Sequence, residues 1–349
     1  MIRLSCASQN YEWGKPGETS IVGRMCSMQG SEPINQSKPY AELWMGTHEK
    51  GASKIFGTDQ LLSVWLRKNP HVLGDKMQNL VKEPDSEVQL PFLFKVLSVN
   101  KALSIQAHPD KAEACRLHER DPKNYPDPNH KPEMAIALTS FEMLCNVKEL
   151  RSVIGDECYE KFSRVASSKN VNDEELKNAL RACFTALMNR PSDCLQTALQ
   201  SLVNRIRDDS VVNVGVVDAK LILRLSRCFP GDVGCFAPFF LNHFYLEPGE
   251  AVFLGPNEPH AYLFDCIECM ACSDNTIRAG LTPKYKDVDT LCRVLSYRCV
   301  SPELLKVAAK SSVAQDRCVT IYSPPISEFA AHRITVRNLL VIRFLILSF

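Results

Sequence analysis

The sequence has no excess of charge of either sign and no long hydrophobic run. Lys and Arg number 41 against 40 Asp and Glu in 349 residues, which leaves a net charge of +1. That balance gives no basis for binding nucleic acid or an anionic membrane surface. The longest apolar stretch, residues 339–347, is interrupted by Arg343 and is too short to span a bilayer. We therefore expect a small-molecule ligand, with no nucleic-acid or membrane partner.

Signals for export and for disulfide formation are also missing. Residues 1–13 contain no apolar segment long enough for a secretory signal. The 15 cysteines are odd in number, scattered, and set among apolar residues, as in 182–184 and 234–236. Such cysteines are typical of reduced thiols in a cytoplasmic protein. We expect cytoplasmic localisation and free thiols.

The texture of the sequence changes twice along the chain. Residues 1–146 contain short β-branched and aromatic runs separated by Pro and Gly, and this texture returns in 230–300. Between them, residues 147–229 carry apolar side chains at helical spacing, most clearly in 176–188, and Asn172 with Glu175 forms a capping-box pattern. We predict a mainly β protein in which two β portions form a cupin-like jelly-roll catalytic domain, interrupted by a helical insertion domain.

Four residues in the β portions could bind a metal. Gln106 and His108 lie two positions apart, so a strand would place them on one face. Glu133 and His260 are candidates to join them, and two imidazoles, a carboxylate and an amide oxygen suit one Zn²⁺ with an open position. Spacing alone leaves the assignment open, because a single histidine more often has a structural hydrogen bond. His130, close to Glu133, remains ambiguous.

The run Cys266–Cys272 offers a rival metal site with three thiols. In an extended strand Cys266 and Cys269 point to opposite faces, and no second Cys-x-x-Cys pair is present to complete four ligands. We therefore do not expect a structural zinc in this run.

Several long motifs occur in order along the chain: 11–15, 38–48, 90–99, 103–111, 129–138 and 272–284. With these motifs the chain resembles the eukaryotic type I, zinc-dependent mannose-6-phosphate isomerases, also called phosphomannose isomerases. The resemblance implies an aldose–ketose isomerase that interconverts mannose 6-phosphate and fructose 6-phosphate and supplies GDP-mannose for glycosylation. It further implies a monomeric enzyme with a small sugar phosphate as its substrate.

The same resemblance assigns the site residues. Gln106, His108, Glu133 and His260 match the four zinc ligands of the family, and Arg278 matches its active-site arginine. Other matches line the sugar-phosphate cleft of the family: Trp13, Lys95, Ser104, Lys131, Glu268 and Lys284.

Aldose–ketose isomerisation moves one proton between C1 and C2 through an enediol. We expect Glu268 to carry this proton, with Lys131 and the metal adjusting its pKa. Arg278, Lys284 and the Ser104 hydroxyl are expected to bind the dianionic phosphate through charge-assisted hydrogen bonds.

Two features depart from the family pattern. The turn between Tyr262 and Glu268 is shorter by about one residue, which could shift the strand register and turn Glu268 away from the metal. Residues 301–349 read as a remnant of a second, C-terminal jelly-roll that is largely missing, with an apolar end that must pack on the catalytic body or remain an unpaired edge. These features leave a catalytically impaired relative, which binds zinc or sugar phosphate as a regulatory or interaction protein, as the alternative. A cupin dioxygenase is a weaker possibility, because more histidine ligands are expected for iron.

Overall fold

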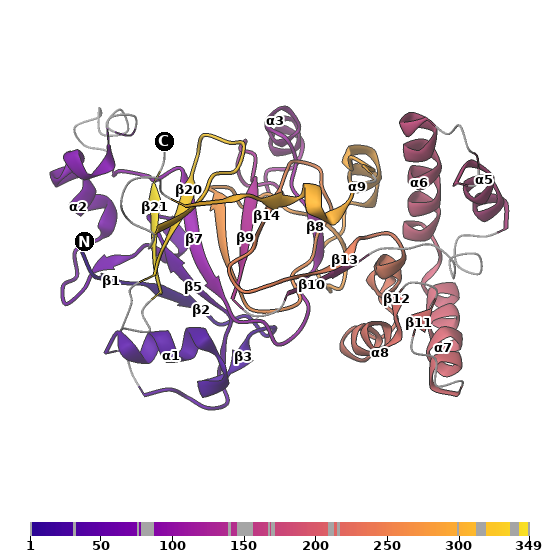
Figure 1. Ribbon diagram of the computed structural model, residues 1–349, viewed down its shortest axis with the longest axis horizontal. Helices are drawn as coiled ribbons and strands as arrows, with labels where there is room; N and C mark the ends of the chain where they lie inside the picture. The colour runs from indigo at the N-terminus through magenta and orange to yellow at the C-terminus, as the bar shows by residue number, and fades with distance from the viewer. Residues whose placement is uncertain are drawn as a thin grey trace.

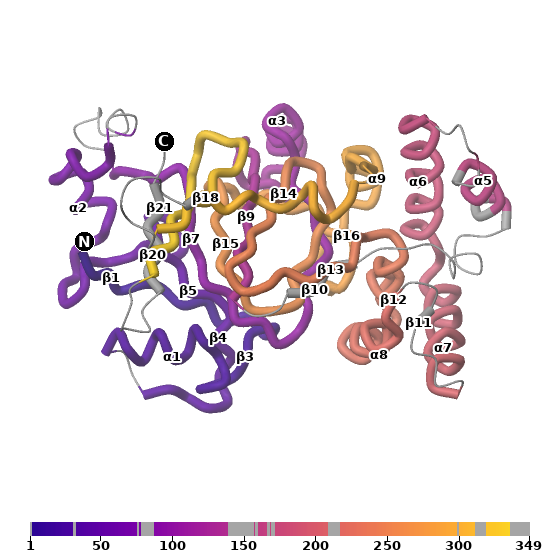
Figure 2. The backbone as a smooth tube through the Cα atoms, in the orientation of Figure 1, coloured from indigo at the N-terminus to yellow at the C-terminus, as the bar shows by residue number. Residues whose placement is uncertain are grey.

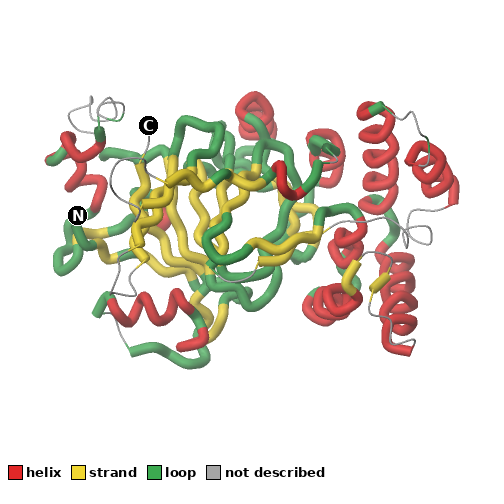
Figure 3. The backbone as a smooth tube through the Cα atoms, viewed as in Figure 1, coloured by secondary structure: helices red, strands yellow, loops and turns green. Residues whose placement is uncertain are grey.

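The structure is a computed structural model that describes residues 2–30, 33–74, 77, 87–138, 141–144, 156–166, 168, 172–208, 213–214, 217–298, 300–311, 319–335 and 342–347. Its strands gather in one body, and a group of helices extends from one end of it (Figure 1, Figure 3). The helices are α1 (Ile21–Met28), α2 (Leu62–Lys68), α3 (Lys111–Arg120), α5 (Asp156–Ala166), α6 (Asp173–Met188), α7 (Ser192–Asp208), α8 (Ala219–Cys228) and α9 (Val288–Val294).

The central element is an antiparallel sheet of seven strands. In spatial order these are β17 (Lys306–Val307), β14 (Ala251–Leu254), β9 (Glu133–Ala137), β15 (Cys266–Ala271), β7 (Phe92–Leu97), β5 (Glu42–Met45) and β2 (Ala7–Gln9). Every residue of β7, β9 and β15 is buried, because both faces of the sheet are covered. The predicted mainly β architecture is confirmed.

The two faces of this sheet pack differently. The outer face carries Phe94, Ile136 and Ile267, which pack with Val22 of α1 and with Tyr322 near the end of the chain. Successive side chains of a strand point to opposite faces, so the residues between these belong to the inner face. The inner face carries apolar residues that pack around Tyr262: Leu97, Ala135, Ala137, Val252, Leu254 and Cys266. Polar residues of the inner face therefore point into the body of the molecule.

A smaller pair of strands stands opposite this inner face. Strand β8 (Ile105–Ala107) pairs with β16 (Ile277–Gly280), and Gln106 forms an isolated antiparallel bridge with His260 on its other side. The remaining short pairs are β1 (Leu4–Ser5) with β6 (Lys54–Ile55), β3 (Lys15–Pro16) with β4 (Pro39–Tyr40), β10 (Phe141–Leu144) with β13 (His243–Leu246), and β11 (Asn213–Val214) with β12 (Val217–Asp218).

Helices α5, α6, α7 and α8 lie together at the end of the molecule away from both termini (Figure 1). The capping box at the start of α6 is confirmed: the Asn172 side chain accepts a hydrogen bond from the Glu175 backbone N–H, and the Glu175 side chain accepts one from the Asn172 N–H. Helix α7 begins directly after Pro191, inside the predicted helical insertion. The predicted boundary at 146 and 147 lies outside the described residues.

The last part of the chain forms a four-stranded antiparallel sheet, with β18 (Ala309–Ser311), β19 (Val319–Tyr322), β20 (Ala330–Thr335) and β21 (Ile342–Leu347) in that order. Strand β21, within the apolar end, pairs with β20 over its whole length and is the edge strand of this sheet. Figure 2 shows β20 beside the central strands, and Tyr322, Phe329 and Ala331 are buried there. The rest of the predicted apolar end, 336–341 and 348–349, is outside the described residues.

Two further expectations concern thiols and membranes. No disulfide bond is observed among the cysteines whose side chains are described, and several of these cysteines are buried in the core. Among the described residues, none of the helices combines the length and the apolar character that crossing a membrane requires.

Candidate active site

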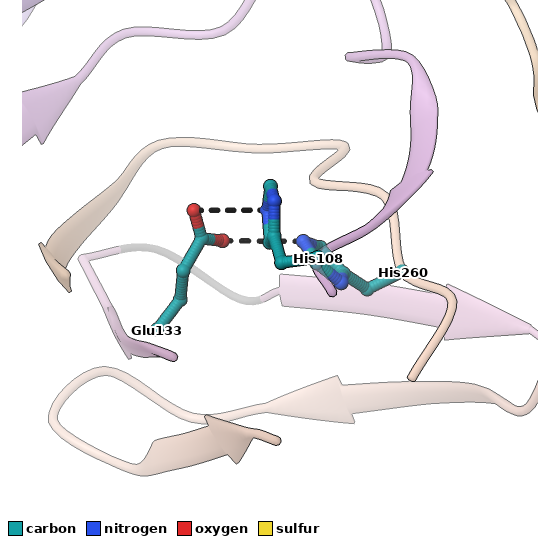
Figure 4. Close-up of side chains that lie close together, drawn as sticks. All are labelled: His108, Glu133 and His260. Atoms are coloured by element: carbon teal, nitrogen blue, oxygen red, sulfur yellow. Dashed lines mark hydrogen bonds and ion pairs between the residues drawn. The ribbon is translucent and has the colours of Figure 1, made fainter. Parts of the chain in front are cut away.

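Three predicted ligands converge on the inner side of the central sheet. His108 Nε2 lies 3.2 Å from Oε1 of Glu133, and His260 Nε2 lies 3.1 Å from Oε2 of the same carboxylate (Figure 4). The three side chains are buried, and their ligand atoms all lie within 4.8 Å of one another. They come from the end of β8, the start of β9 and the turn before Tyr262, which are far apart in the sequence. No other His, Cys, Asp or Glu cluster of this kind occurs among the described residues.

The protonation of the two imidazoles fits a bound cation. His108 Nδ1 lies 2.7 Å from the Asn275 carbonyl, and His260 Nδ1 lies 3.0 Å from the Glu258 carbonyl. A carbonyl only accepts, so each Nδ1 carries the proton, and in a neutral ring each Nε2 then presents its lone pair to Glu133. Burial and the charge of Lys131 lower the pKa of His108 to about 4, so its ring is neutral near pH 7. A metal between the lone pairs and the carboxylate would resolve their repulsion.

Two buried atoms without a hydrogen bond support the same interpretation. His108 Nε2 and Glu133 Oε1 are buried, yet neither forms a hydrogen bond of acceptable geometry with the described residues. Buried polar atoms without such partners are costly unless an ion or water satisfies them. The residues present therefore fit a divalent metal held by nitrogen and carboxylate oxygen.

Glu133 also has two neighbours that fix its charge and orientation. Lys131 Nζ lies 2.9 Å from Oε1, and the Tyr262 hydroxyl donates to Oε2 at 3.1 Å. Burial alone would raise the pKa of Glu133, but the charge of Lys131 outweighs it and holds this pKa well below its usual range. The carboxylate is therefore ionised and available as a ligand. Lys131, predicted to adjust the pKa of Glu268, has its direct contact with Glu133.

The pairing of β8 places Gln106 and Arg278 toward the same centre. Gln106 exchanges two backbone hydrogen bonds with His260, at 2.9 and 3.0 Å, and its other neighbour in register is Arg278. Residues directly opposite in an antiparallel pair point to the same face, and His108 follows Gln106 by two positions. Gln106, His108, His260 and Arg278 thus share a face. The Gln106 side-chain oxygen accepts a hydrogen bond from the Ser104 hydroxyl at 3.4 Å.

A second buried charged cluster lies on the inner face of the sheet. Lys95 Nζ forms a 2.7 Å ion pair with Glu268 and lies 3.6 Å from Glu42, which accepts a hydrogen bond from the Trp44 indole at 2.5 Å. Burial and the charge of Glu133 raise the pKa of Glu268. For Lys95, the attraction of Glu268 and Glu42 outweighs burial and raises its pKa. Because its pKa is raised, the Glu268 carboxyl is better suited than an exposed carboxyl to accept and release a proton.

The strand register answers the concern about the short turn. Glu268 on β15 is opposite Lys95 on β7 and opposite Ala135 on β9. Ala135 belongs to the inner face, two positions after Glu133, so Glu268 points toward the same side as the His–Glu–His group. The register shift considered from the sequence does not occur. On the same strand, Cys266 and Cys269 pack in different clusters on opposite faces, as expected for a strand that binds no metal through both.

Two predicted substrate-binding residues lie together at another position. Trp13 stacks on Tyr11 with ring centroids 5.9 Å apart, and Lys284 Nζ lies 5.9 Å from the centroid of the Tyr11 ring. Among the described residues, no direct contact is observed between these three side chains, Trp13, Tyr11 and Lys284, and the His–Glu–His group. They therefore form a separate part of the candidate site. Lys284 is exposed, which leaves its ammonium accessible to an anion.

Sequence reasoning missed Tyr262, Glu42 and Tyr11 as site residues. Tyr262 follows His260 by two positions, and the same alternation that joined Gln106 to His108 could have indicated it. Glu42 lies in one of the motifs that carry the resemblance, but its contact with Lys95 depends on the pairing of β5 with β7.

The comparisons with known proteins agree with this site. Residues 1–150 match phosphomannose isomerase type I, catalytic domain, and residues 153–241 match phosphomannose isomerase type I, helical insertion domain. Mannose-6-phosphate isomerase of Mus musculus is 45% identical over 95% of this chain and 81% of its own length. Mannose-6-phosphate isomerase 2 of Arabidopsis thaliana is 41% identical over 94% of this chain and 77% of its own length.

Solved structures give the same result. A zinc-bound mannose 6-phosphate isomerase superposes with a TM-score of 0.75 at 29% identity, covering 95% of this chain and 83% of that one. The apo form from Salmonella typhimurium also has a TM-score of 0.75, at 31% identity, with 96% and 82% covered. The chain belongs to the type I phosphomannose isomerase family.

Proposed function

We propose that this chain interconverts mannose 6-phosphate and fructose 6-phosphate and so supplies mannose 6-phosphate for GDP-mannose synthesis. The observation that carries the proposal is the buried His–Glu–His group on the same inner face as the Lys95–Glu268 pair. A metal-binding centre beside a carboxyl of raised pKa is suited to aldose–ketose isomerisation, because the metal can polarise the carbonyl and the carboxyl can carry the proton.

His108, Glu133 and His260 are proposed to hold one zinc ion, with Gln106 as the fourth ligand. Support for Gln106 comes from its place opposite His260 and from the shared strand face. Bound zinc acts as a Lewis acid that polarises the sugar carbonyl and stabilises negative charge on its oxygens. Tyr262 and Lys131 keep Glu133 oriented and ionised for this task.

Glu268 is the proposed proton carrier. Its carboxylate removes the proton from C2 of the aldose, which gives an enediolate with the negative charge on O1. The proton on O2 then passes to O1, and Glu268 returns its proton to C1, which gives the ketose. The reaction neither gains nor loses electrons. Lys95 holds the Glu268 carboxylate in one position through their 2.7 Å contact and prevents an uncompensated buried charge when the proton leaves.

The sugar phosphate needs cationic and hydroxyl groups. Arg278 is half-buried and no ion pair to it is observed among the described residues, so its guanidinium is available for a dianion. Lys284 and the Ser104 hydroxyl are the further phosphate contacts in this proposal. Trp13 and Lys95 line the sugar-binding part of the same cleft.

The remaining assignments are also proposals. Residues 1–146 and 230–300 form the catalytic domain, 147–229 the helical insertion, and 301–349 a C-terminal remnant. The protein works as a monomer in the cytoplasm, without nucleic-acid or membrane partners. The near-balanced charge and the free thiols support this assignment.

A coupled assay tests the function. The purified chain is incubated with mannose 6-phosphate, and fructose 6-phosphate formation is followed through phosphoglucose isomerase and an NADP-linked dehydrogenase. We expect turnover that a chelator abolishes and added zinc restores. A zinc-loaded, folded chain without turnover would overturn the proposal.

A further inference from the structure

The orientation of His108 depends on the backbone of a residue far away in the sequence. His108 Nδ1–H donates to the Asn275 carbonyl at 2.7 Å, so this carbonyl selects the tautomer in which Nε2 faces Glu133. Asn275 is completely buried, and it lies in the turn between β15 and β16. A turn without regular pairing needs other contacts to hold one carbonyl in place.

The Asn275 side chain provides these contacts. Its Nδ2 atom donates to the Asp127 carbonyl at 2.6 Å, to the Asp127 carboxylate at 3.3 Å and to the Asn129 carbonyl at 3.0 Å. The Asn275 backbone N–H donates to the Ser273 hydroxyl at 3.1 Å, and that hydroxyl donates to the Asn129 carbonyl at 3.0 Å. The carbonyl that contacts His108 is therefore fixed on both sides.

The same network holds the segment that leads to Glu133. The Asn129 side chain donates to the Cys272 carbonyl at 2.9 Å, and the Asp127 carboxylate accepts from the Asp274 N–H at 2.8 Å. Segment 127–129 is thus joined to segment 272–275 by both side chains and backbone. Glu133 follows four residues later at the start of β9, so one network anchors the supports of two ligands.

We propose that Asn275 is a positioning residue for metal binding, which aligns His108 through its carbonyl while Asp127, Asn129 and Ser273 hold that carbonyl in place. The inference rests on the proposed zinc site. Groups that bind the second nitrogen of a metal-ligating histidine fix its tautomer and ring orientation, and their loss typically weakens metal affinity about 10- to 100-fold.

Zinc affinity tests this role directly. The metal-free full chain is titrated with zinc in competition with a chromogenic chelator, and the visible spectrum of the cobalt-substituted protein reports the ligand geometry. We expect Asn275→Ala to weaken zinc affinity about 10- to 100-fold and to change the cobalt spectrum. Ser273→Ala, a smaller change in the same network, is expected to weaken the affinity less and in the same direction.

Asn242→Ala is the matched control, because the Asn242 side chain also donates to a backbone carbonyl, that of Val300, at 3.0 Å and outside the network. Unchanged zinc affinity in Asn275→Ala, or an equal loss in Asn242→Ala, would overturn the proposal. If Asn275→Ala does not fold, Ser273→Ala decides: weaker zinc binding supports the role and unchanged binding rejects it. A wild-type chain that binds zinc without turnover would refute the isomerase function and leave this inference standing.

Discussion

Replacing Glu268 with Gln separates the catalytic role of this residue from its structural role. The variant keeps the size of the side chain but removes the charge that lies 2.7 Å from Lys95. Breaking a buried ion pair by removing one partner costs about 3 to 5 kcal/mol. The lower end applies here, because Glu42 still lies 3.6 Å from the ammonium and because Gln does not bear the cost of burying a carboxylate.

A loss of about 3 kcal/mol corresponds to a fall in Tm of about 6 to 12 °C for a domain of ordinary size. Turnover of the folded variant should fall by about 100- to 10,000-fold, because general acid–base catalysis contributes a factor of that size. The loss of stability alone would not lower the rate of the molecules that remain folded. Zinc content should be unchanged, since the contact of Glu268 is with Lys95 and not with the three ligand side chains. Calorimetry, the coupled assay and metal analysis measure the three quantities.

The pH dependence adds a further readout. Because the pKa of Glu268 is raised, the wild-type rate should decline with acid at a higher pH than an ordinary carboxyl would cause, and the variant should lose this dependence. In the metal-free protein, the raised pKa means that the unfolded chain releases this proton first. The contribution of Glu268 to stability therefore falls as the pH rises from the unfolded pKa through the folded one, and Gln removes that slope.

The matched control is Glu303→Gln, which removes a 3.0 Å contact with Lys306 from an exposed carboxylate. It should leave both turnover and Tm unchanged, because exposed ion pairs contribute little. Near-normal turnover in Glu268→Gln would remove this residue from the proton path. An unchanged Tm would show that the buried pair does not stabilise the fold as argued.

Three other predictions concern the metal, the phosphate and the thiols. Removing zinc should abolish turnover, and free zinc at about 100 times its Kd should raise the free energy of unfolding by about 2.7 kcal/mol, so a Tm that does not respond to zinc would contradict the site. Arg278→Ala should lower kcat/KM about 10- to 150-fold, the equivalent of one hydrogen bond to a charged group, and unchanged KM and kcat would reject the assignment of Arg278. Burial raises the pKa of Cys266 and Cys269 well above the usual range, so iodoacetamide at about pH 8 should label the exposed Cys194 first. Mass spectrometry measures the order of labelling, and rapid labelling of Cys269 in the folded chain would refute this prediction.

The parts of the fold that sequence could predict are those with local causes. The period of apolar residues and the capping box at Asn172 identify α6, and alternation along an extended strand separates Cys266 from Cys269. The candidate ligands His108, Glu133 and His260 were predicted because their residue types suit a metal and because they match a family pattern. Their convergence is what the structure adds, with ligand atoms within 4.8 Å.

Other parts of the site depend on pairing between distant strands, which no local pattern specifies. Glu42 approaches Lys95 only because β5 lies beside β7, and Asn275 reaches Asp127 only because two turns meet at one end of the sheet. The register of β15 is a similar case: a short turn raised doubt about Glu268, but pairing with strands on both sides sets its direction. Register in a central strand is strongly specified, because a shift of one residue would expose its apolar face.

The C-terminal segment contacts two parts of the chain that support the candidate site. The Tyr322 hydroxyl donates to the Gly249 carbonyl at 2.7 Å, in the turn that leads into β14, and Phe329 packs with the outer face of the central sheet. Glu328 Oε1 lies 2.6 Å from Nε2 of His130, which precedes Lys131 directly. The loop that carries Lys131 and leads to Glu133 is therefore supported on one side by the Asn275 network and on the other by the C-terminal sheet. Because the ligands come from separate segments, their geometry depends on such supports as much as on the ligands themselves.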